Sequence, residues 1–501
     1  MACTNMTPTI RSQHDVRTQA FDSLPDELVH IDGRTVPGDG ESVEHIHPGN
    51  GESLGERRLA SVDQVDTAVQ SAADSSPAWW ALPPPQRRDL LLSIAALMRA
   101  ECQQLGAIVS AEMGMPLRTS VMGVHHAAEW FTHYAGYADK IGGRAPQIGA
   151  PGSTVNYTQR VPHGVIAAIT PWNGPIVALA LKVAPALAAG NTVVLKPSEL
   201  APFSSLAIAE LSARAGLPPG VLNVVGAAAD GGARLSQHPS VGLISFTGGN
   251  TAGAAVAQAA AARHARAVLE LGGKSASLVF GDVDVARTAK ISLLLGAVQN
   301  SGQGCFLPTR VLVHRSIYSP FLDAMAAAAA AVRIGDPFDR RTAMGPVVSE
   351  AARERIRGVV ATALDAGSGR LLTGGGIPQN HQLGSFLEPT VFADVDMSSP
   401  LAQDEIFGPV LSVAPFDDTE EAVAVANSTA FGLAGYVWTR DLSRAHRVAS
   451  ALEAGNVSVN GMASLPPETV FNGWKASGLG VEGGREGFEE YTRTRNINIT
   501  L

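Results

Sequence analysis

The chain has 501 residues, 45% of them hydrophobic and 17% charged, and this length predicts two or three domains because a single hydrophobic core stops growing at a smaller size. Its formal net charge of -9 argues against a nucleic-acid partner, which would require a basic surface. Abundant alanine and an aromatic content of only 5% favour an α/β protein over a β-sandwich.

The amino-terminal part of the chain is predicted to be helical after a disordered start. Residues 1–20 are polar and aperiodic, and they lack the apolar core of a secretory signal. From 62 to 112 the apolar residues recur with a helical period, which is broken at 83–85 because three consecutive prolines cannot continue a helix. A further helix is expected over 125–137, followed by a loop and by an edge strand over 153–161.

From Gly164 onward, short apolar runs alternate with Ala-rich amphipathic segments. The runs GVIAAIT, NTVVLKP, VLNVVG, VGLISFTG and AVLELGG are strand candidates, and their alternation with helices is typical of βαβ units and a parallel sheet. A second series, from about 275 to beyond 456, predicts a second α/β domain, and the tail 491–501 reads as a strand at a subunit edge. The most apolar stretch, 176–189, is too short to span a bilayer and is interrupted by Lys182.

Cys305 is the first candidate for chemistry. A lone cysteine is usually a small buried hydrophobe, and Cys3 and Cys102 keep that interpretation. Cys305, however, ends the Gly-rich segment 300–304, and such loops bring backbone N–H groups close to a reacting atom. Three widely spaced cysteines give no disulfide framework, which favours a reducing cytoplasm.

No metal site and no membrane contact are predicted. The His125-His126 pair and the residues His45 and His47 lack further ligands at useful spacing, so we expect them to be surface histidines. The sequence also lacks a polybasic run that would bind an anionic membrane surface.

Two further residues could act beside the thiol. Glu270 is flanked by leucines at the end of a strand, where poor solvation would raise its pKa toward that of a general base; a salt bridge to Lys274 is the equally weighted alternative. Asn173 follows the strand GVIAAIT, where its side-chain amide could donate to a developing oxyanion or could simply close an Asx turn.

Two segments have the character of nucleotide-binding loops. The segment 246–253 is a strand, a Gly-rich turn and a helix start, which offers backbone N–H groups to a pyrophosphate although it is not GxGxxG. Lys196 and Glu199 follow another strand and could bind the ribose hydroxyls of an adenosine; the alternative is a solvated loop.

Together these elements resemble the aldehyde dehydrogenase superfamily in order and spacing, from about residue 25 to the end. The motifs that carry the resemblance are Trp172-Asn173, Lys196 with Glu199, Phe246-Thr247-Gly248, Glu270-Leu-Gly-Gly-Lys, Gly302-Gln-Gly-Cys305, Glu405-Ile-Phe407-Gly-Pro, and the loop 471–478. The resemblance implies a doubly wound parallel-sheet cofactor domain (21–140 and 162–272), an α/β catalytic domain (273–480) and a small oligomerisation sheet (141–161 and 481–501). It also implies a homodimer or homotetramer.

The resemblance implies that an aldehyde is oxidised to a carboxylic acid through a thioester on Cys305. Glu270 would be the general base, and the Asn173 amide and the Cys305 backbone N–H would form the oxyanion hole. Because branches of the family that transfer the acyl group to coenzyme A differ at this position, Glu270 favours hydrolysis to the free acid.

The resemblance also implies a nicotinamide cofactor. Glu405 would hold the nicotinamide ribose, Phe407 would pack near the ring, and Lys196 with Glu199 would bind the adenosine ribose, where the acidic Glu199 favours NAD over NADP. Gly249 departs from the family pattern, because it stands where a serine commonly reaches the pyrophosphate. The other positions expected at the cofactor are Trp172, Ser198, Phe246, Thr247, Gly248, Gly253, Leu271 and Gly272.

The same resemblance suggests a roomy, apolar substrate tunnel. Relatives that take small aldehydes often carry aromatic residues or methionine at the positions of Gly174, Ala178 and Leu181. Leu465 and Phe471 are expected at the mouth of the tunnel, and Phe306 lies beside the nucleophile. We therefore expect a bulky, uncharged, apolar or aromatic aldehyde.

Two rival functions use the same residues differently. A Cys-dependent thioesterase or acyltransferase would need no nicotinamide and would leave Lys196 and Glu199 without a purpose. A silent binding scaffold would be expected to have lost Cys305 or Glu270, and both are present.

Overall fold

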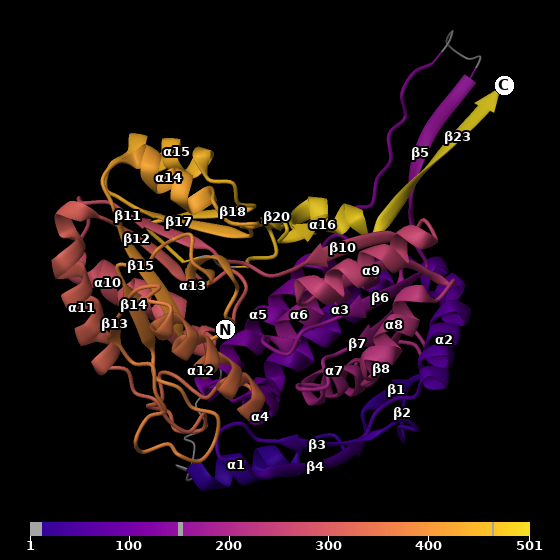
Figure 1. The fold of residues 1–501 in the computed structure, drawn as a ribbon. Helices are drawn as coiled ribbons and strands as arrows, with labels where there is room; N and C mark the ends of the chain where they lie inside the picture. The colour runs from indigo at the N-terminus through magenta and orange to yellow at the C-terminus, as the bar shows by residue number, and fades with distance from the viewer. Residues whose placement is uncertain (1–12, 149–153, 463–464, 501) are drawn as a thin grey trace.

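The computed structural model describes residues 13–148, 154–462 and 465–500, which form two α/β units and a projecting two-stranded ribbon (Figure 1). Each unit is built on its own mostly parallel sheet, which confirms the α/β class expected from the alternating runs.

The first unit contains an eight-stranded sheet in the order β2-β1-β8-β7-β6-β9-β10-β21. Its central strands β6 to β10 run parallel to one another, and β1, β2 and β21 are antiparallel edges. The strands are β1 (Val29–Ile31), β2 (Arg34–Val36), β6 (Val165–Ile169), β7 (Thr192–Lys196), β8 (Leu222–Val225), β9 (Val241–Thr247), β10 (Arg266–Glu270) and β21 (Gly478–Leu479).

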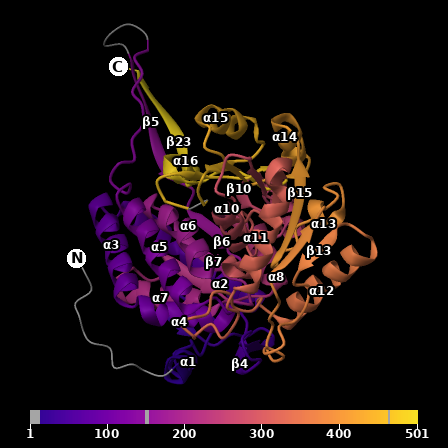
Figure 2. The ribbon, with the colours of Figure 1, turned by 90° about the vertical axis from the view of Figure 1, so that its left-hand side faces the viewer.

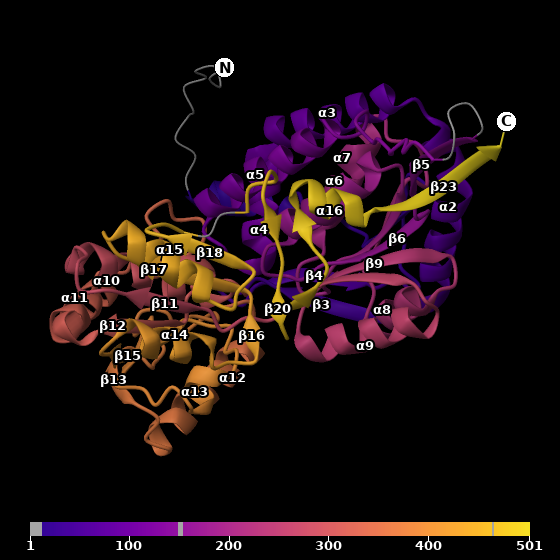
Figure 3. The ribbon, with the colours of Figure 1, turned by 90° about the horizontal axis from the view of Figure 1, so that it is seen from above.

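Helices cover both faces of this sheet, as Figure 3 shows from above. One face packs against α3 (Pro84–Ala100), α4 (Cys102–Met113), α5 (Leu117–Ala135), α6 (Pro175–Ala188) and α7 (Phe203–Arg214), and the other against α2 (Val62–Ala81), α8 (Ala229–Gln237) and α9 (Asn250–Ala262). Burial on both faces explains why every residue of β6, β7 and β8 is buried and why these strands are mostly apolar, β6 throughout.

The direction in which strands are added reverses between β6 and β9. After β6 the chain adds β7 and β8 on one side, and then returns to add β9 and β10 on the other. Sheets of this kind usually bind their ligands where the strand order reverses, in the crevice outside the carboxyl ends of the strands. Residues 170–173, 197–199, 248–249 and 271–273 all follow carboxyl ends here.

The amino-terminal region differs from its prediction in two ways. Residues 1–12 lie outside the described part of the chain, but the expected disorder is wrong from Gln13 onward, because α1 (Gln13–Asp22) is helical. The break at the prolines is confirmed, yet only Pro83 lies outside the helices: Pro84 and Pro85 occupy the first turn of α3, where a missing N–H costs nothing. After α1 the chain forms β1 and β2, and then the hairpin of β3 (Ser42–Ile46) and β4 (Ser53–Arg58).

The second unit has a seven-stranded sheet in the order β13-β14-β15-β12-β11-β17-β18, parallel except for the edge strand β13. Its strands are β11 (Ala276–Val279), β12 (Arg310–His314), β13 (Arg370–Thr373), β14 (Thr390–Ala393), β15 (Val410–Phe416), β17 (Ala434–Trp438) and β18 (Asn456–Val459). Its helices are α10 (Val285–Leu293), α11 (Tyr318–Ala330), α12 (Glu350–Asp365), α13 (Pro400–Gln403), α14 (Thr419–Asn427) and α15 (Leu442–Ala451). The second α/β series is thereby confirmed.

The ribbon pairs β5 (Thr154–Pro162) with β23 (Thr492–Thr500) in antiparallel register, from Thr492 opposite Pro162 to Thr500 opposite Thr154. It projects from the first unit (Figures 1 and 2). Before it, the chain passes through β19 (Val470–Phe471), β20 (Trp474–Lys475), β21, β22 (Glu482–Gly483) and α16 (Gly484–Glu490), with β20 pairing β16 (Phe431–Gly432). The strands predicted over 153–161 and 491–501 are thus confirmed over β5 and β23, while Ser153 and Leu501 lie outside the described part of the chain.

Within the described residues, no helix combines the length and apolarity that a membrane crossing requires.

Candidate active site

Cys305 is presented by a strained loop between α10 and β12. The π-helical turn Leu294–Val298 and the 3-10 turn Gln299–Gly302 lead into it, and Asn300 and Ser301 have φ values of 48° and 53°. Left-handed backbone at two consecutive non-glycine residues is costly and persists only where the surroundings enforce it. Gly302 is also required, because a Cβ there would lie 2.1 Å from the Gly408 carbonyl oxygen.

Asn173, which follows β6, is hydrogen-bonded to the loop that carries Cys305. Its Nδ2 donates to the Gln303 carbonyl oxygen (3.1 Å), and Asn300 Nδ2 donates to the Asn173 carbonyl oxygen (2.8 Å). Asn173 therefore does more than close its own turn, since its amide reaches a residue two positions before Cys305. An NH2 group carries two hydrogens, so one remains available for a further acceptor.

Glu270 ends β10 and is only 1% exposed. Neither carboxylate oxygen has a hydrogen-bond partner in the described structure. Burial, together with the negative charge of Glu482, raises the pKa of Glu270 well above its ordinary value, while Lys182 opposes the shift. The alternative of a salt bridge to Lys274 is wrong, because Lys274 Nζ donates instead to the Leu401 carbonyl oxygen (2.9 Å).

The pair of Lys182 and Glu482 was not anticipated from the sequence. Both side chains are buried, Lys182 Nζ donates to Glu482 Oε1, and it also donates to Ser245 Oγ (3.1 Å). The available signal was a single lysine inside the otherwise apolar segment 176–189, but its partner lies 300 positions further along the chain.

The segment between the two sheets joins Glu270, Cys305 and Glu405. It runs from the carboxyl end of β10 to the start of β11, and a Cβ on Gly273 would lie 2.1 Å from the Cys305 carbonyl oxygen. The Gly273 N–H donates to Glu405 Oε1 (2.9 Å). The carboxyl edge of the first sheet thus meets the loops that precede β12 and β15 in the second.

The thiol of Cys305 is not activated by its protein surroundings alone. Burial of the sulfur raises the pKa of the Cys305 thiol above its usual value, and the charges of Glu405 and Glu270 add to the rise. Since the thiolate is the nucleophile, attack requires a proton acceptor or a nearby positive charge.

The proposed nucleotide residues lie along the same edge. Lys196 Nζ lies 3.6 Å from Glu199 Oε2, with Lys196 buried and Glu199 exposed. The solvated-loop alternative is therefore wrong for Lys196. The neighbouring Ser198 accepts from the Leu200 N–H through its Oγ (3.3 Å).

The Gly-rich turn lies between β9 and α9. Gly249 is the N-cap of α9, and a Cβ built there would meet nothing within 4 Å, so the turn faces open space. Gly253 has a different reason to be glycine, because its Cβ would lie 2.3 Å from Leu271 Cδ2. Phe246 is buried beneath the turn, against Gly248.

Aromatic pairs flank the cysteine loop. Trp172 and Phe407 pack edge to face with ring centroids 5.4 Å apart, and Phe306 and Phe471 do so at 6.4 Å. Edge-to-face packing of this kind fixes the orientation of each ring.

The expected tunnel residues of α6 share one face of the helix. Gly174, Ala178 and Leu181 are spaced by four and three positions, and a Cβ on Gly174 would meet nothing within 4 Å. The Leu465 carbonyl oxygen is anchored by Trp130 Nε1 (3.1 Å).

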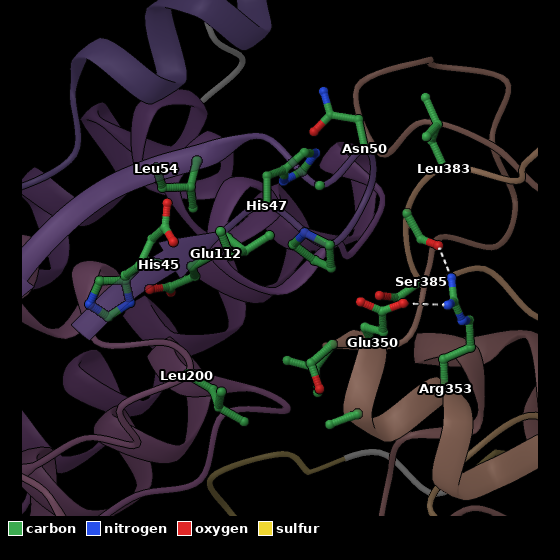
Figure 4. A pocket seen from close by; sticks show the side chains of 18 of the residues that line it. His45, His47, Asn50, Leu54, Glu112, Leu200, Glu350, Arg353, Leu383 and Ser385 are labelled. Carbon is green, nitrogen blue, oxygen red and sulfur yellow. Dashed lines mark hydrogen bonds and ion pairs between the residues drawn. The ribbon is translucent and has the colours of Figure 1, made fainter. Parts of the chain in front are cut away.

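A cavity of about 720 Å³ lies beside the nucleotide edge, between the β3–β4 hairpin, the loop after β7 and the start of α12 (Figure 4). Glu199 lines it, whereas Cys305 and Glu270 do not. This cavity is therefore separate from the cysteine loop, although it borders the proposed ribose-binding residues.

The surface-histidine expectation is wrong for His45 and His47, which line this cavity and are 6% and 1% exposed. Burial lowers the pKa of His45 to about 4, and His47 Nδ1 lies 2.8 Å from the Ala111 carbonyl oxygen. His125 is exposed as expected, but His126 is half-buried and its Nε2 accepts from Trp130. Over residues 13–148, 154–462 and 465–500, no three His, Cys, Asp or Glu side chains are arranged to hold a metal.

Comparisons with known proteins identify the family of this chain. The model of the aldehyde dehydrogenase family matches residues 35–497. Betaine aldehyde dehydrogenase 2 of Rhizobium meliloti (strain 1021) is 39% identical over 472 residues, which cover 94% of this chain and 96% of the relative.

Solved structures agree as well. Betaine aldehyde dehydrogenase of Staphylococcus aureus, in complex with NAD+, superposes with a TM-score of 0.94 at 32% identity and covers 97% of each chain. A putative aldehyde dehydrogenase of Burkholderia cenocepacia gives 0.91 at 39% identity, covering 95% of this chain and 97% of its own. The chain described here belongs to the aldehyde dehydrogenase family, whose members oxidise aldehydes.

Proposed function

We propose that this chain is an NAD-dependent aldehyde dehydrogenase that releases a free carboxylic acid, with Cys305 as nucleophile and Glu270 as general base. The observation that carries the proposal is the meeting of three groups at one sheet edge. The buried, unpaired carboxyl of Glu270 lies on the segment that contacts the Cys305 backbone, and Asn173 is hydrogen-bonded to the same cysteine loop.

In the first half of the reaction, the Cys305 thiolate attacks the aldehyde carbon and forms a C–S bond. Negative charge develops on the aldehyde oxygen, where the Asn173 amide and the Cys305 backbone N–H donate. Losing one such donor typically costs about 100- to 1000-fold in rate. Bound NAD supplies the hydride acceptor, and the oxidised carbon remains on Sγ as a thioester.

In the second half, Glu270 accepts a proton from water, and the resulting hydroxide attacks the thioester carbonyl. The C–S bond breaks, the acid leaves and the Cys305 sulfur is restored. A carboxyl whose pKa is raised by burial suits this task, since a general base works best with a pKa near the operating pH.

The residues at the sheet edge fit a dinucleotide. The Gly248–Gly249 turn, which is open at Gly249, offers backbone N–H groups at the start of α9, and Lys196 with Glu199 can bind ribose hydroxyls. Glu405, held by the Gly273 N–H, faces the second ribose in this proposal. An exposed carboxylate at Glu199 opposes a 2′-phosphate, so NAD is preferred over NADP.

For the substrate, we propose a bulky, uncharged aldehyde, because the α6 face carries small residues and open space at Gly174. A trimethylammonium aldehyde is a second candidate, since two of the relatives named above are betaine aldehyde dehydrogenases and the Phe306–Phe471 pair offers aromatic rings to a cation.

We also propose a cytoplasmic homodimer or homotetramer built through the ribbon. The ribbon is an exposed two-stranded structure, and unpaired strand edges readily pair with another chain. Light scattering after gel filtration tests this, and a monomer at micromolar concentration would refute it.

The deciding experiment is reduced-nicotinamide absorbance with NAD and NADP. It is run across acetaldehyde, aryl aldehydes and betaine aldehyde, with Cys305→Ala as control. Thiol-dependent reduction supports the proposal, and the substrate ranking separates the two candidates. NAD quenching of tryptophan fluorescence without any turnover would favour a silent scaffold, and ester hydrolysis without NAD binding would favour a thioesterase.

A further inference from the structure

Asn250, the first residue of α9, connects three segments that lie far apart in the sequence. Its Oδ1 accepts from the Gly272 N–H (3.1 Å), and its Nδ2 donates to the Ala476 carbonyl oxygen (2.6 Å). The helix itself has no side-chain cap, because its N-cap is Gly249. The Asn250 amide is therefore committed to tertiary contacts and not to its own helix.

The segment that Asn250 holds also holds Glu405. The consecutive N–H groups of Gly272 and Gly273 donate to Asn250 Oδ1 and to Glu405 Oε1. A Cβ on Gly272 would lie 2.8 Å from Asn250 Oδ1 and 2.6 Å from Glu405 Oε2, so the two side chains flank one glycine. These two N–H groups belong to the two peptides that meet at Gly272, so a change in the backbone dihedrals of Gly272 would disturb this pair of hydrogen bonds.

The opposite side of the segment is fixed by Ser477. Its Oγ donates to the Gly272 carbonyl oxygen (2.7 Å), and its carbonyl oxygen accepts from the Leu271 N–H (2.8 Å). Because Ala476 precedes Ser477, the bond from Asn250 to Ala476 closes a ring of contacts around Gly272.

We propose that Asn250 is a positioning residue for Glu405: by accepting from the Gly272 N–H it fixes the backbone at Gly272, and the next N–H, that of Gly273, then aims the Glu405 carboxylate at the nicotinamide ribose. The inference rests on the proposed function, since that function gives Glu405 its ligand. Asn250 directly follows the Gly248–Gly249 turn. The same hydrogen-bonded segment would therefore hold both the pyrophosphate and the nicotinamide ribose of the dinucleotide.

The test compares Asn250→Ala with Asn223→Ala. Asn223 makes the same kind of bridge away from this edge, accepting from the Asp32 N–H (2.9 Å) and donating to the Gly220 carbonyl oxygen (2.8 Å). Asn250→Ala should raise the Kd for NAD, measured by tryptophan quenching without aldehyde, and the KM for NAD by about tenfold. The KM for aldehyde should change less than twofold, and Asn223→Ala should change neither NAD constant.

A double-mutant cycle with Glu405→Gln tests whether Asn250 acts through Glu405. The double variant should bind NAD no more weakly than Glu405→Gln alone. A double variant whose loss of NAD affinity equals the product of the two single losses would overturn the inference. Unchanged NAD binding in Asn250→Ala would overturn it as well. If Asn250→Ala does not fold, the same cycle is run with Asn250→Ser.

The failure of the inference and the failure of the proposed function are distinguishable. Weaker NAD binding in Asn250→Ala, in a protein that oxidises no aldehyde, would leave the positioning role standing while removing the proposed activity. If the protein oxidises aldehydes normally and Asn250→Ala leaves the Kd and KM for NAD unchanged, the proposed function stands and the positioning role of Asn250 falls.

Discussion

Removing either member of the buried Lys182–Glu482 pair should destabilise the fold, and the two variants should shift the pKa of Glu270 in opposite directions. Lys182→Met leaves the Glu482 carboxylate buried without its counter-charge, which costs about 3–5 kcal/mol of stability. For a cooperative unit of about 200 residues this corresponds to a fall of roughly 6–20 °C in Tm. Glu482→Gln should cost less, because Lys182 keeps its hydrogen bond to Ser245.

The same two variants should move the pKa of Glu270 in opposite directions. Lys182 lowers that pKa and Glu482 raises it. Lys182→Met therefore raises it further, and Glu482→Gln lowers it. A shift of one pKa unit corresponds to about 1.4 kcal/mol of interaction with the Glu270 charge, which is the order of magnitude that we expect for the loss of one buried neighbouring charge.

The assay is the pH dependence of kcat under saturating NAD and aldehyde. A general base works only when deprotonated, so the acid limb should move up by about one pH unit in Lys182→Met and down by about as much in Glu482→Gln. Lys140→Met is the matched control, since Lys140 is 67% exposed beside Asp139 and should alter neither Tm nor the profile. Limbs that move in the same direction, or do not move, would refute this electrostatic account of Glu270.

Three further predictions concern the thiol, the cofactor and the tunnel. Glu405→Gln removes a charge that raises the pKa of the Cys305 thiol, so iodoacetamide should alkylate Cys305 about tenfold faster at pH 8, and an unchanged rate would contradict the assigned cause. Glu199→Gln should improve kcat/KM for NADP relative to NAD by roughly tenfold, because a carboxylate no longer opposes the 2′-phosphate; a constant ratio would show that Glu199 does not select the cofactor. Ala178→Phe should raise the KM for a bulky aryl aldehyde by at least about tenfold and leave that for acetaldehyde within about twofold. Equal effects on both aldehydes would place Ala178 outside the tunnel.

The sequence predicted most of what depends on local pattern. The alternation of apolar runs and Ala-rich segments predicted both parallel sheets, because strands buried on both faces must be continuously apolar. Glu270 and Asn173 follow strand ends, and the carboxyl edge of a parallel sheet brings such positions together.

Other features depend on contacts that no local pattern encodes. Residues 13–22 are too polar to predict a helix, but α1 docks through a salt bridge from Arg17 to Asp336 (3.4 Å) and through Phe21, which packs edge to face on His47. The burial of His47 follows from the same packing. The partner of Lys182 was likewise unpredictable, because the chain returns to α6 only at β22.

The most direct test of the proposed mechanism is single turnover of Glu270→Gln with NAD and a good aldehyde. Reduced nicotinamide should form in a burst of about one equivalent per active site and then stop, with steady turnover lowered by about 100-fold or more. Mass spectrometry of the quenched protein should find the acyl group on the peptide that contains Cys305. Near-normal steady turnover, or a burst without an adduct on Cys305, would contradict a thioester hydrolysed through Glu270.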